Sequence, residues 1–276
     1  MAPTRSERPF TLAAAALWAS ALWLFEHVCF DATESFRPGA ITDIVSVSAC
    51  VVLATSATVF AMVRVHAPDV SLRVTLGIRP VSPWKLLLAA AAGAGLSPAL
   101  STVDDLIARR WPYDDPDAAE SMQKLLSSSS RLALVLCVFV VIPLAREVFF
   151  RGIVFTALRR PSTGGNEEYG GDKAGLSTGV VVAATAILFG VFSLDWRSMP
   201  TALVLGLALG WLRAKTGSLV APIVTHLAFW SVQGIPILQG ADLSADFAFP
   251  PRWIAGGAIG AVFALALAAL PSPARS

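Results

Sequence analysis

Long apolar runs separated by short polar segments dominate the chain. A helix needs about 20 mostly apolar residues to cross the hydrocarbon core of a bilayer, and the runs recur at or near that length. They predict eight membrane-spanning helices, the sixth of them short: residues 10–30, 41–63, 84–100, 132–150, 176–194, 200–212, 218–238 and 253–270. We therefore expect an all-α, polytopic membrane protein of about eight transmembrane helices.

Composition supports a membrane protein and excludes other classes. The 276 residues are 55% hydrophobic and 14% charged, with a mean hydropathy of +0.66, which is too apolar for a soluble domain of this length. The net charge of +2 is small and the basic residues are dispersed, so nucleic acid is not an expected partner. The three cysteines lie in apolar runs without metal-ligand spacing. The expected partner is the lipid bilayer itself.

The first run and the loop charges predict the orientation. Ala19-Ser20-Ala21 resembles a signal-peptide cleavage site, but hydrophobicity continues through residues 22–25, which favours an uncleaved helix. Eight spans place both termini on one side, whose loops hold thirteen Lys and Arg residues against seven on the other. By the positive-inside rule, both termini are cytoplasmic. We expect an integral protein of a bacterial inner (plasma) membrane.

Three ionisable residues crowd the end of the fourth run: Arg146, Glu147 and Arg151. A charge near the bilayer centre costs roughly 2.5–3.5 kcal/mol on insertion scales, so such residues usually face a bundle interior or a wet cavity. Glu147 and Arg151 are four residues apart and share a helix face, where they can pair. The carboxylate could act as a general base toward water, or the pair could anchor the cytoplasmic end of the helix.

His226 is the third candidate site residue. It lies roughly 12 Å into the seventh span, counted at 1.5 Å per residue, where a contact with Glu147 is geometrically possible. A lone intramembrane histidine can equally make an ordinary interhelical hydrogen bond, as we expect of His27 beside Glu26. Glu147 and His226 are fewer than the three protein ligands of a catalytic zinc, so we expect neither a metal nor another cofactor.

These residues fall in motifs that resemble the CAAX-protease and bacteriocin-processing (CPBP, or Abi) family of intramembrane glutamic proteases, which includes type II CAAX prenyl endopeptidases. The family's Glu-Glu pair followed by Phe-Arg-Gly aligns with Arg146-Glu147 through Phe150-Arg151-Gly152. Its Phe-x-x-x-His aligns with Phe189 to Ser193, and its His-x-x-x-Asn with His226 to Trp230. Residues 205–222 match its Gly-rich sixth span, and residues 76–79 resemble an upstream element. The resemblance covers residues 131–233.

The resemblance divides the chain into three parts. Residues 1–130 hold the N-terminal transmembrane helices and loops, residues 131–238 the protease-like core, and residues 239–276 the last loop and the C-terminal transmembrane helix.

The departures from the motifs concern catalysis. In the family, the first Glu and the second-motif His position the attacking water, and the third-motif His and Asn stabilise the oxyanion. This chain has Arg146, Ser193 and Trp230 at three of those positions and keeps His226 alone. Glu147 would have to act as base although adjacent helix positions point about 100° apart. Asp195 and Gln233 are further substitutes.

Two functions follow from these residues. The first is a catalytically degenerate relative that binds or regulates a membrane protein, including a paralogous protease. The second is an active intramembrane endopeptidase that cleaves a membrane-bound peptide or protein with Glu147, Arg151 and His226. Convergence of Glu147, Ser193 and His226 on a water-sized polar cavity would favour the enzyme.

Overall fold

The computed structural model describes residues 10–66, 70–112, 124, 129–159, 176–193, 196–239 and 249–270. Among these residues there is no β-strand, and each of the eight apolar runs contains a helix. Seven of the runs form single helices: α1 (Leu12–Phe36), α2 (Ile44–His66), α4 (Pro83–Arg110), α9 (Thr178–Phe192), α10 (Met199–Thr216), α11 (Val220–Leu238) and α12 (Pro251–Ala268). The all-α membrane fold is confirmed.

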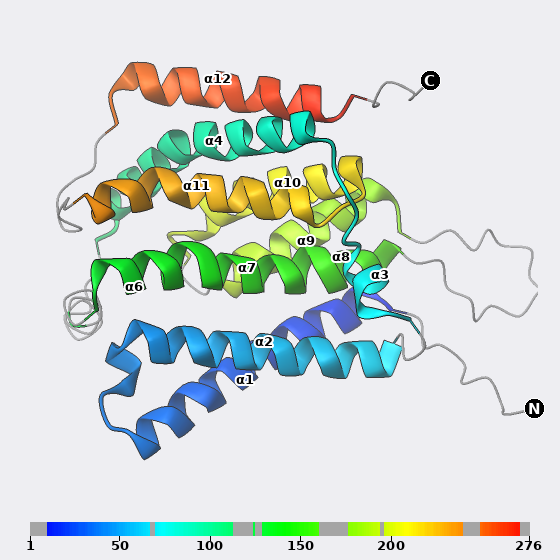
Figure 1. Cartoon of the computed structure of the whole chain (residues 1–276), viewed down its shortest axis with the longest axis vertical. Coiled ribbons are helices and arrows are strands. Elements are labelled where there is room, and N and C mark those ends of the chain that lie inside the picture. The colour runs from blue at the N-terminus through cyan, green and yellow to red at the C-terminus, as the bar shows by residue number, and fades with distance from the viewer. Residues whose placement is uncertain are drawn as a thin grey trace, which may run out of the picture.

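Five of the helices are long and apolar enough to cross a bilayer, and α9 and residues 220–235 of α11 are shorter apolar helices. The number of crossings therefore remains a prediction. Figure 1 shows that α1 begins and α12 ends at the same end of the bundle, as an even number of crossings requires.

The fourth run forms a longer helix than the sequence predicts. It extends from Arg131 to Arg159 through α6 (Arg131–Leu136), η2 (Cys137–Val141), α7 (Ile142–Glu147), η3 (Val148–Val154) and α8 (Phe155–Arg159), in which η2 and η3 are π-helical. The predicted end at residue 150 is too early, because Arg151 is buried and paired inside the protein. Glu147 consequently lies near the middle of this helix, not at its end.

The bundle is a stack with the Arg131–Arg159 helix at its centre. In Figure 1, α12 lies on the outside, followed by α4, then α10 and α11, then α6 to α8, and finally α2 and α1. Two minor elements, η1 (Ala40–Thr42) and α3 (Leu72–Leu76), occupy connections. The largest buried cluster includes Phe149, Phe150 and Ile153 from the central helix and Leu22 and Met62 from α1 and α2.

Glycine sets the spacing between α4 and its neighbours. A Cβ on Gly93 would lie 2.0 Å from the Thr225 carbonyl oxygen of α11, and one on Gly95 would lie 2.5 Å from the Gly257 carbonyl oxygen of α12. In lipid, helix association depends on such close backbone approach, because lipid tails solvate apolar side chains as well as other helices do. The position of α11, which carries His226, therefore depends on Gly93.

Gly93→Ala should lower the free energy of unfolding by about 3 kcal/mol, because the backbone of α11 must move away from the new methyl group. Gly256→Ala is the matched control: Gly256 lies on an exposed face of α12 with nothing within 4 Å of the added Cβ, and alanine favours helix by about 1 kcal/mol. Unfolding in mixed micelles measures both. Equal stability of the two variants would contradict the close contact.

Candidate functional site

The irregular backbone of the central helix surrounds Glu147. Pro143 has no backbone N–H and cannot bond the carbonyl one turn earlier, and the π-helical η2 immediately precedes α7, the segment that contains it. A second π-helical segment, η3, begins directly after Glu147. Such wide turns are rare in helices and frequently occur at functional sites.

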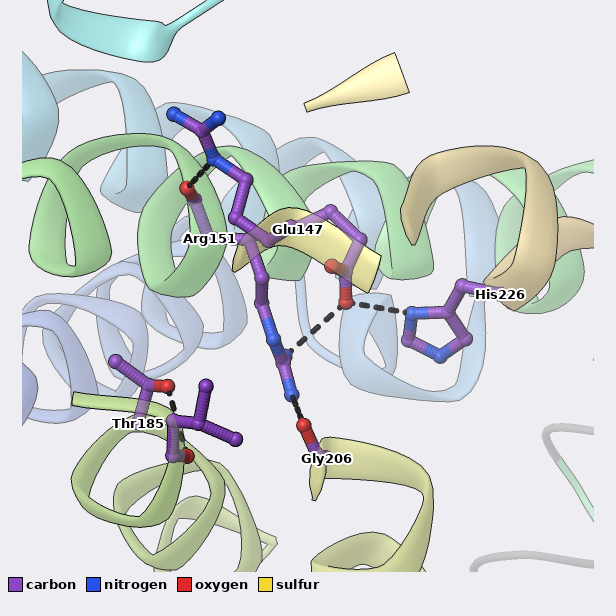
Figure 2. A network of polar contacts seen from close by, with 7 residues as sticks. Glu147, Arg151, Thr185, Gly206 and His226 are labelled. Carbon is purple, nitrogen blue, oxygen red and sulfur yellow. Dashed lines mark hydrogen bonds and ion pairs between the residues drawn. The ribbon is translucent and has the colours of Figure 1, made fainter. Parts of the chain in front are cut away.

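Glu147, Arg151 and His226 form a buried polar cluster, shown in Figure 2. The Arg151 Nη1 donates to Glu147 Oε1 at 3.1 Å, and the His226 Nδ1 lies 2.8 Å from the same oxygen. The side chains of Glu147 and Arg151 are fully buried, and His226 is 3% exposed. Glu147 Oε1 therefore contacts both the Arg151 guanidinium and the His226 imidazole. The three residues expected to share a site do lie together.

Arg151 is held by groups from two further helices. Its Nη2 donates to the Gly206 carbonyl of α10 at 3.2 Å, and its guanidinium lies 4.3 Å from the ring centroid of Phe189 in α9. The Phe189 ring also meets His226 edge to face at 5.9 Å. Phe189 begins the second motif, yet sequence reasoning did not include it in the site. Its motif position was the available signal.

Arg146 faces away from this cluster. Its guanidinium forms a two-pronged ion pair with Glu26 of α1, in which Nη2 lies 3.0 Å from Oε2 and Nη1 also binds Oε1. The ring of Phe192 lies 4.3 Å from this guanidinium. The 100° step between adjacent helix positions accounts for the divergence, because Arg146 points toward α1 and Glu147 toward α11.

The expected pairing of Glu26 with His27 is absent. Glu26 binds Arg146, whereas His27 Nδ1 bonds the Trp23 carbonyl at 2.9 Å. Sequence reasoning therefore missed Glu26, because its partner lies 120 residues away.

The other two departing motif positions make contacts of their own. The Ser193 hydroxyl donates to the Gly190 carbonyl at 2.6 Å, at the end of α9. Trp230 stacks on Phe139 with ring centroids 5.4 Å apart. Neither contact includes Glu147 or His226. Of the suggested substitutes, Gln233 donates to Ser101 of α4 at 2.7 Å, and Asp195 lies outside the described residues.

Arg213 contacts the backbone of this cluster from α10. The predicted run ends at residue 212, which places Arg213 in a loop. In the structure Arg213 is 5% exposed and lies in the last turn of α10. Its Nε donates to the Arg151 carbonyl at 2.9 Å, and its Nη2 donates to Thr156 Oγ1 at 3.0 Å. A cation at a helix end is commonly interpreted as solvent-exposed, and nothing in the local sequence indicates this burial.

The charges of the site balance, but two polar atoms are unsatisfied. Glu26 offsets Arg146, and Glu147 offsets Arg151. The described residues provide no hydrogen-bond partner for Glu147 Oε2 or Arg151 Nε. They also contain no group of three or more His, Cys, Asp or Glu side chains able to hold a metal ion.

Comparison with protein families identifies the region that carries these residues. The model of the type II CAAX prenyl endopeptidase Rce1-like family matches residues 128–232. This region includes Arg146, the Glu147 cluster, α9, α10 and α11 as far as residue 232. No curated protein and no solved structure gives a significant match to the chain. The resemblance inferred from the motifs is confirmed over this region.

Glu147→Gln should reduce the free energy of unfolding by about 3–5 kcal/mol, because the buried Arg151 guanidinium loses its counter-charge. Removing both charges, with Glu147→Gln and Arg151→Met, should restore part of this loss. The measurement is unfolding in mixed micelles. A single variant as stable as wild type would show that Glu147 is already protonated in the native protein.

The Arg146–Glu26 pair should behave as a charge pair in a double-mutant cycle. Arg146→Glu and Glu26→Arg should each destabilise the protein, whereas the combined exchange should recover stability with a coupling free energy of about 1–3 kcal/mol. Additive losses in the double variant would refute the pairing.

Proposed function

Since this chain is an integral membrane member of the CAAX-type protease family, we propose that it binds or regulates a membrane protein and has no peptidase activity of its own. The observation that carries the proposal is the Arg146–Glu26 ion pair. The motif position that holds the first glutamate in the family is occupied here by a cation, and that cation is directed to another helix.

The remaining carboxylate is poorly suited to replace it. Glu147 Oε1 already accepts hydrogen bonds from Arg151 and His226. Both partners are protein side chains, so this oxygen is occupied by the protein and not by a water that it could activate. His226 Nδ1 is engaged by the same Glu147 oxygen, so this nitrogen is not available to an oxyanion.

The other motif positions favour packing over water activation. A serine hydroxyl is not a base near neutral pH, and the Ser193 hydroxyl donates to the Gly190 carbonyl of its own helix. Trp230 replaces an amide by a larger indole that stacks on Phe139. A protein that keeps the fold but changes these side chains retains a surface for binding. A membrane-embedded protein, such as a paralogous protease, is the class of partner we propose.

One observation favours the alternative, an active endopeptidase that uses Glu147 and His226 on a membrane-bound peptide or protein. Glu147 Oε2 is buried and has no hydrogen-bond partner among the described residues. A buried polar group without a partner commonly marks a bound water, and a water at this oxygen would be placed for general-base catalysis.

Proteoliposomes that contain the purified chain and fluorescently labelled membrane peptides should release no cleaved fragment, and Glu147→Gln should not change this result. Robust wild-type cleavage that Glu147→Gln abolishes would overturn the proposal in favour of the endopeptidase. Thermal unfolding of both proteins provides the control, because Glu147→Gln alters stability under either function.

Restoring the motif positions tests the cause of inactivity. Arg146→Glu, Ser193→His and Trp230→Asn together should create measurable cleavage where wild type shows none. The structure requires Glu26→Gln in the same variant, because two carboxylates would otherwise face each other at the site of the present ion pair. Glu147→Gln in this four-residue background is the matched control. It removes the native carboxylate and keeps the glutamate introduced at residue 146. A folded but inactive four-residue variant would show that more than these positions has changed.

A further inference from the structure

Basic side chains gather at one end of the bundle. Figure 1 places the ends of α2, α8 and α10, the start of α4 and the whole of α3 together at this end. The described cations there are Arg64, Arg73, Arg79, Lys85, Arg159, Arg213 and Lys215. The described carboxylates lie elsewhere: Glu26 and Glu147 within the bundle, and Asp31, Glu34, Asp43, Asp104 and Asp105 toward the opposite end. Among the described residues this end therefore carries cations only.

Three of these cations converge around the turn between α10 and α11. Arg213 Nη2 donates to Thr156 Oγ1 at 3.0 Å, and Thr156 lies in α8, three residues before Arg159. Arg79 Nη1 would lie 3.8 Å from a Cβ built on Gly217, the residue that caps α10. We call Arg79, Arg159 and Arg213 the arginine cluster. Both Arg79 and Arg159 are exposed, so they are accessible to a ligand.

The fold holds two members of the arginine cluster, Arg79 and Arg213, in place. The Arg79 N–H donates to Ser218 Oγ at 3.3 Å, and the Ser218 hydroxyl donates to the Arg79 carbonyl at 2.6 Å. Gly77, with φ of +65°, leaves room for the Arg213 guanidinium: a Cβ there would lie 2.0 Å from Nη2. Like charges fixed at close range are costly, and an anion bound between them removes this cost.

We propose that the arginine cluster binds the phosphate of an anionic phospholipid headgroup. Guanidinium groups match the geometry of phosphate and bind it with paired hydrogen bonds. Trp84 beside Lys85, and Trp211 with Lys215 4.4 Å from its ring, provide the aromatic side chains typical of the headgroup region. The exposed Arg79 and Arg159 contact the headgroup, and the buried Arg213 adds a third positive charge. This inference does not depend on whether the protein cleaves peptides.

The site is also connected to the Glu147 cluster. Arg213 Nε donates to the carbonyl of Arg151, which pairs with Glu147. A bound headgroup would therefore stabilise the position of α10 against the central helix, and the lipid should raise the thermal stability of the native protein.

The test measures binding of a fluorescent phosphatidylglycerol to the purified full chain in neutral detergent, with fluorescent phosphatidylcholine as the comparison lipid. Wild type should prefer phosphatidylglycerol. Arg79→Gln with Arg159→Gln should weaken this binding about 25-fold, at about fivefold for each charge near the membrane surface. Arg79→Lys with Arg159→Lys keeps the charge and should retain most of it.

The matched control removes the same number of charges at the opposite end of the bundle. Arg37→Gln with Arg252→Gln should leave phosphatidylglycerol affinity within about twofold of wild type, since only the two local charges are worth about fivefold each. Equal losses in the two glutamine variants would refute a local site and leave only an effect of net charge. Equal affinity for both lipids in wild type would refute the proposal as well.

Inorganic phosphate separates a lipid headgroup from a free anion. Phosphate should not displace phosphatidylglycerol at matched ionic strength, because the acyl chains of the lipid stay in the detergent micelle around the protein. Displacement by phosphate would overturn the lipid assignment. Thermal unfolding of each variant shows whether it is folded. If the glutamine variant is unfolded, the lysine variant becomes the test. Loss of phosphatidylglycerol binding in the lysine variant would contradict a charge-based site.

Discussion

The fold is organised around one carboxylate that must be satisfied within an apolar bundle. Glu147 is fully buried, and its Oε1 accepts hydrogen bonds from Arg151 on its own helix and His226 on α11. Arg151 in turn reaches the Gly206 carbonyl of α10, and its charge lies over Phe189 of α9. Because an unpaired charge in this environment is costly, the four helices that supply these groups are constrained to one arrangement. The same polar contacts thus specify both the site and the packing.

A second ion pair balances the charge at residue 146, where the chain departs from the family motif that it resembles. An unpaired cation at residue 146 would be costly inside an apolar bundle, and Glu26 of α1 neutralises it on the other side of the central helix. Trp230 is likewise accommodated by stacking on Phe139. Each substitution therefore has a neighbour that satisfies it in the folded protein. These contacts account for a well-packed site without a glutamate at residue 146.

Backbone irregularity gives these side chains their directions. The π-helical segments before and after α7 occur where Pro143 interrupts regular bonding and where Glu147 and Arg151 pair. On the other side, Gly93 allows the α11 backbone to approach α4 closely. The His226 imidazole is brought to Glu147 from a helix whose position is set by backbone contact. Arg213 then joins this interior to the basic end of the bundle through the Arg151 carbonyl.

The sequence by itself determined the helices and the core of the site. Apolar runs of membrane-spanning length predicted all eight helical segments, since burial in lipid requires a continuous apolar stretch and local backbone bonding. The four-residue spacing predicted the Glu147–Arg151 pair. Only the tertiary structure showed that Arg146 pairs with Glu26, that Ser193 bonds its own helix and that Arg213 is buried. It also showed the central helix continuing to Arg159. Hydropathy counts each charge as a cost regardless of its partner, whereas a buried ion pair depends on a residue brought near by packing and far away in the chain.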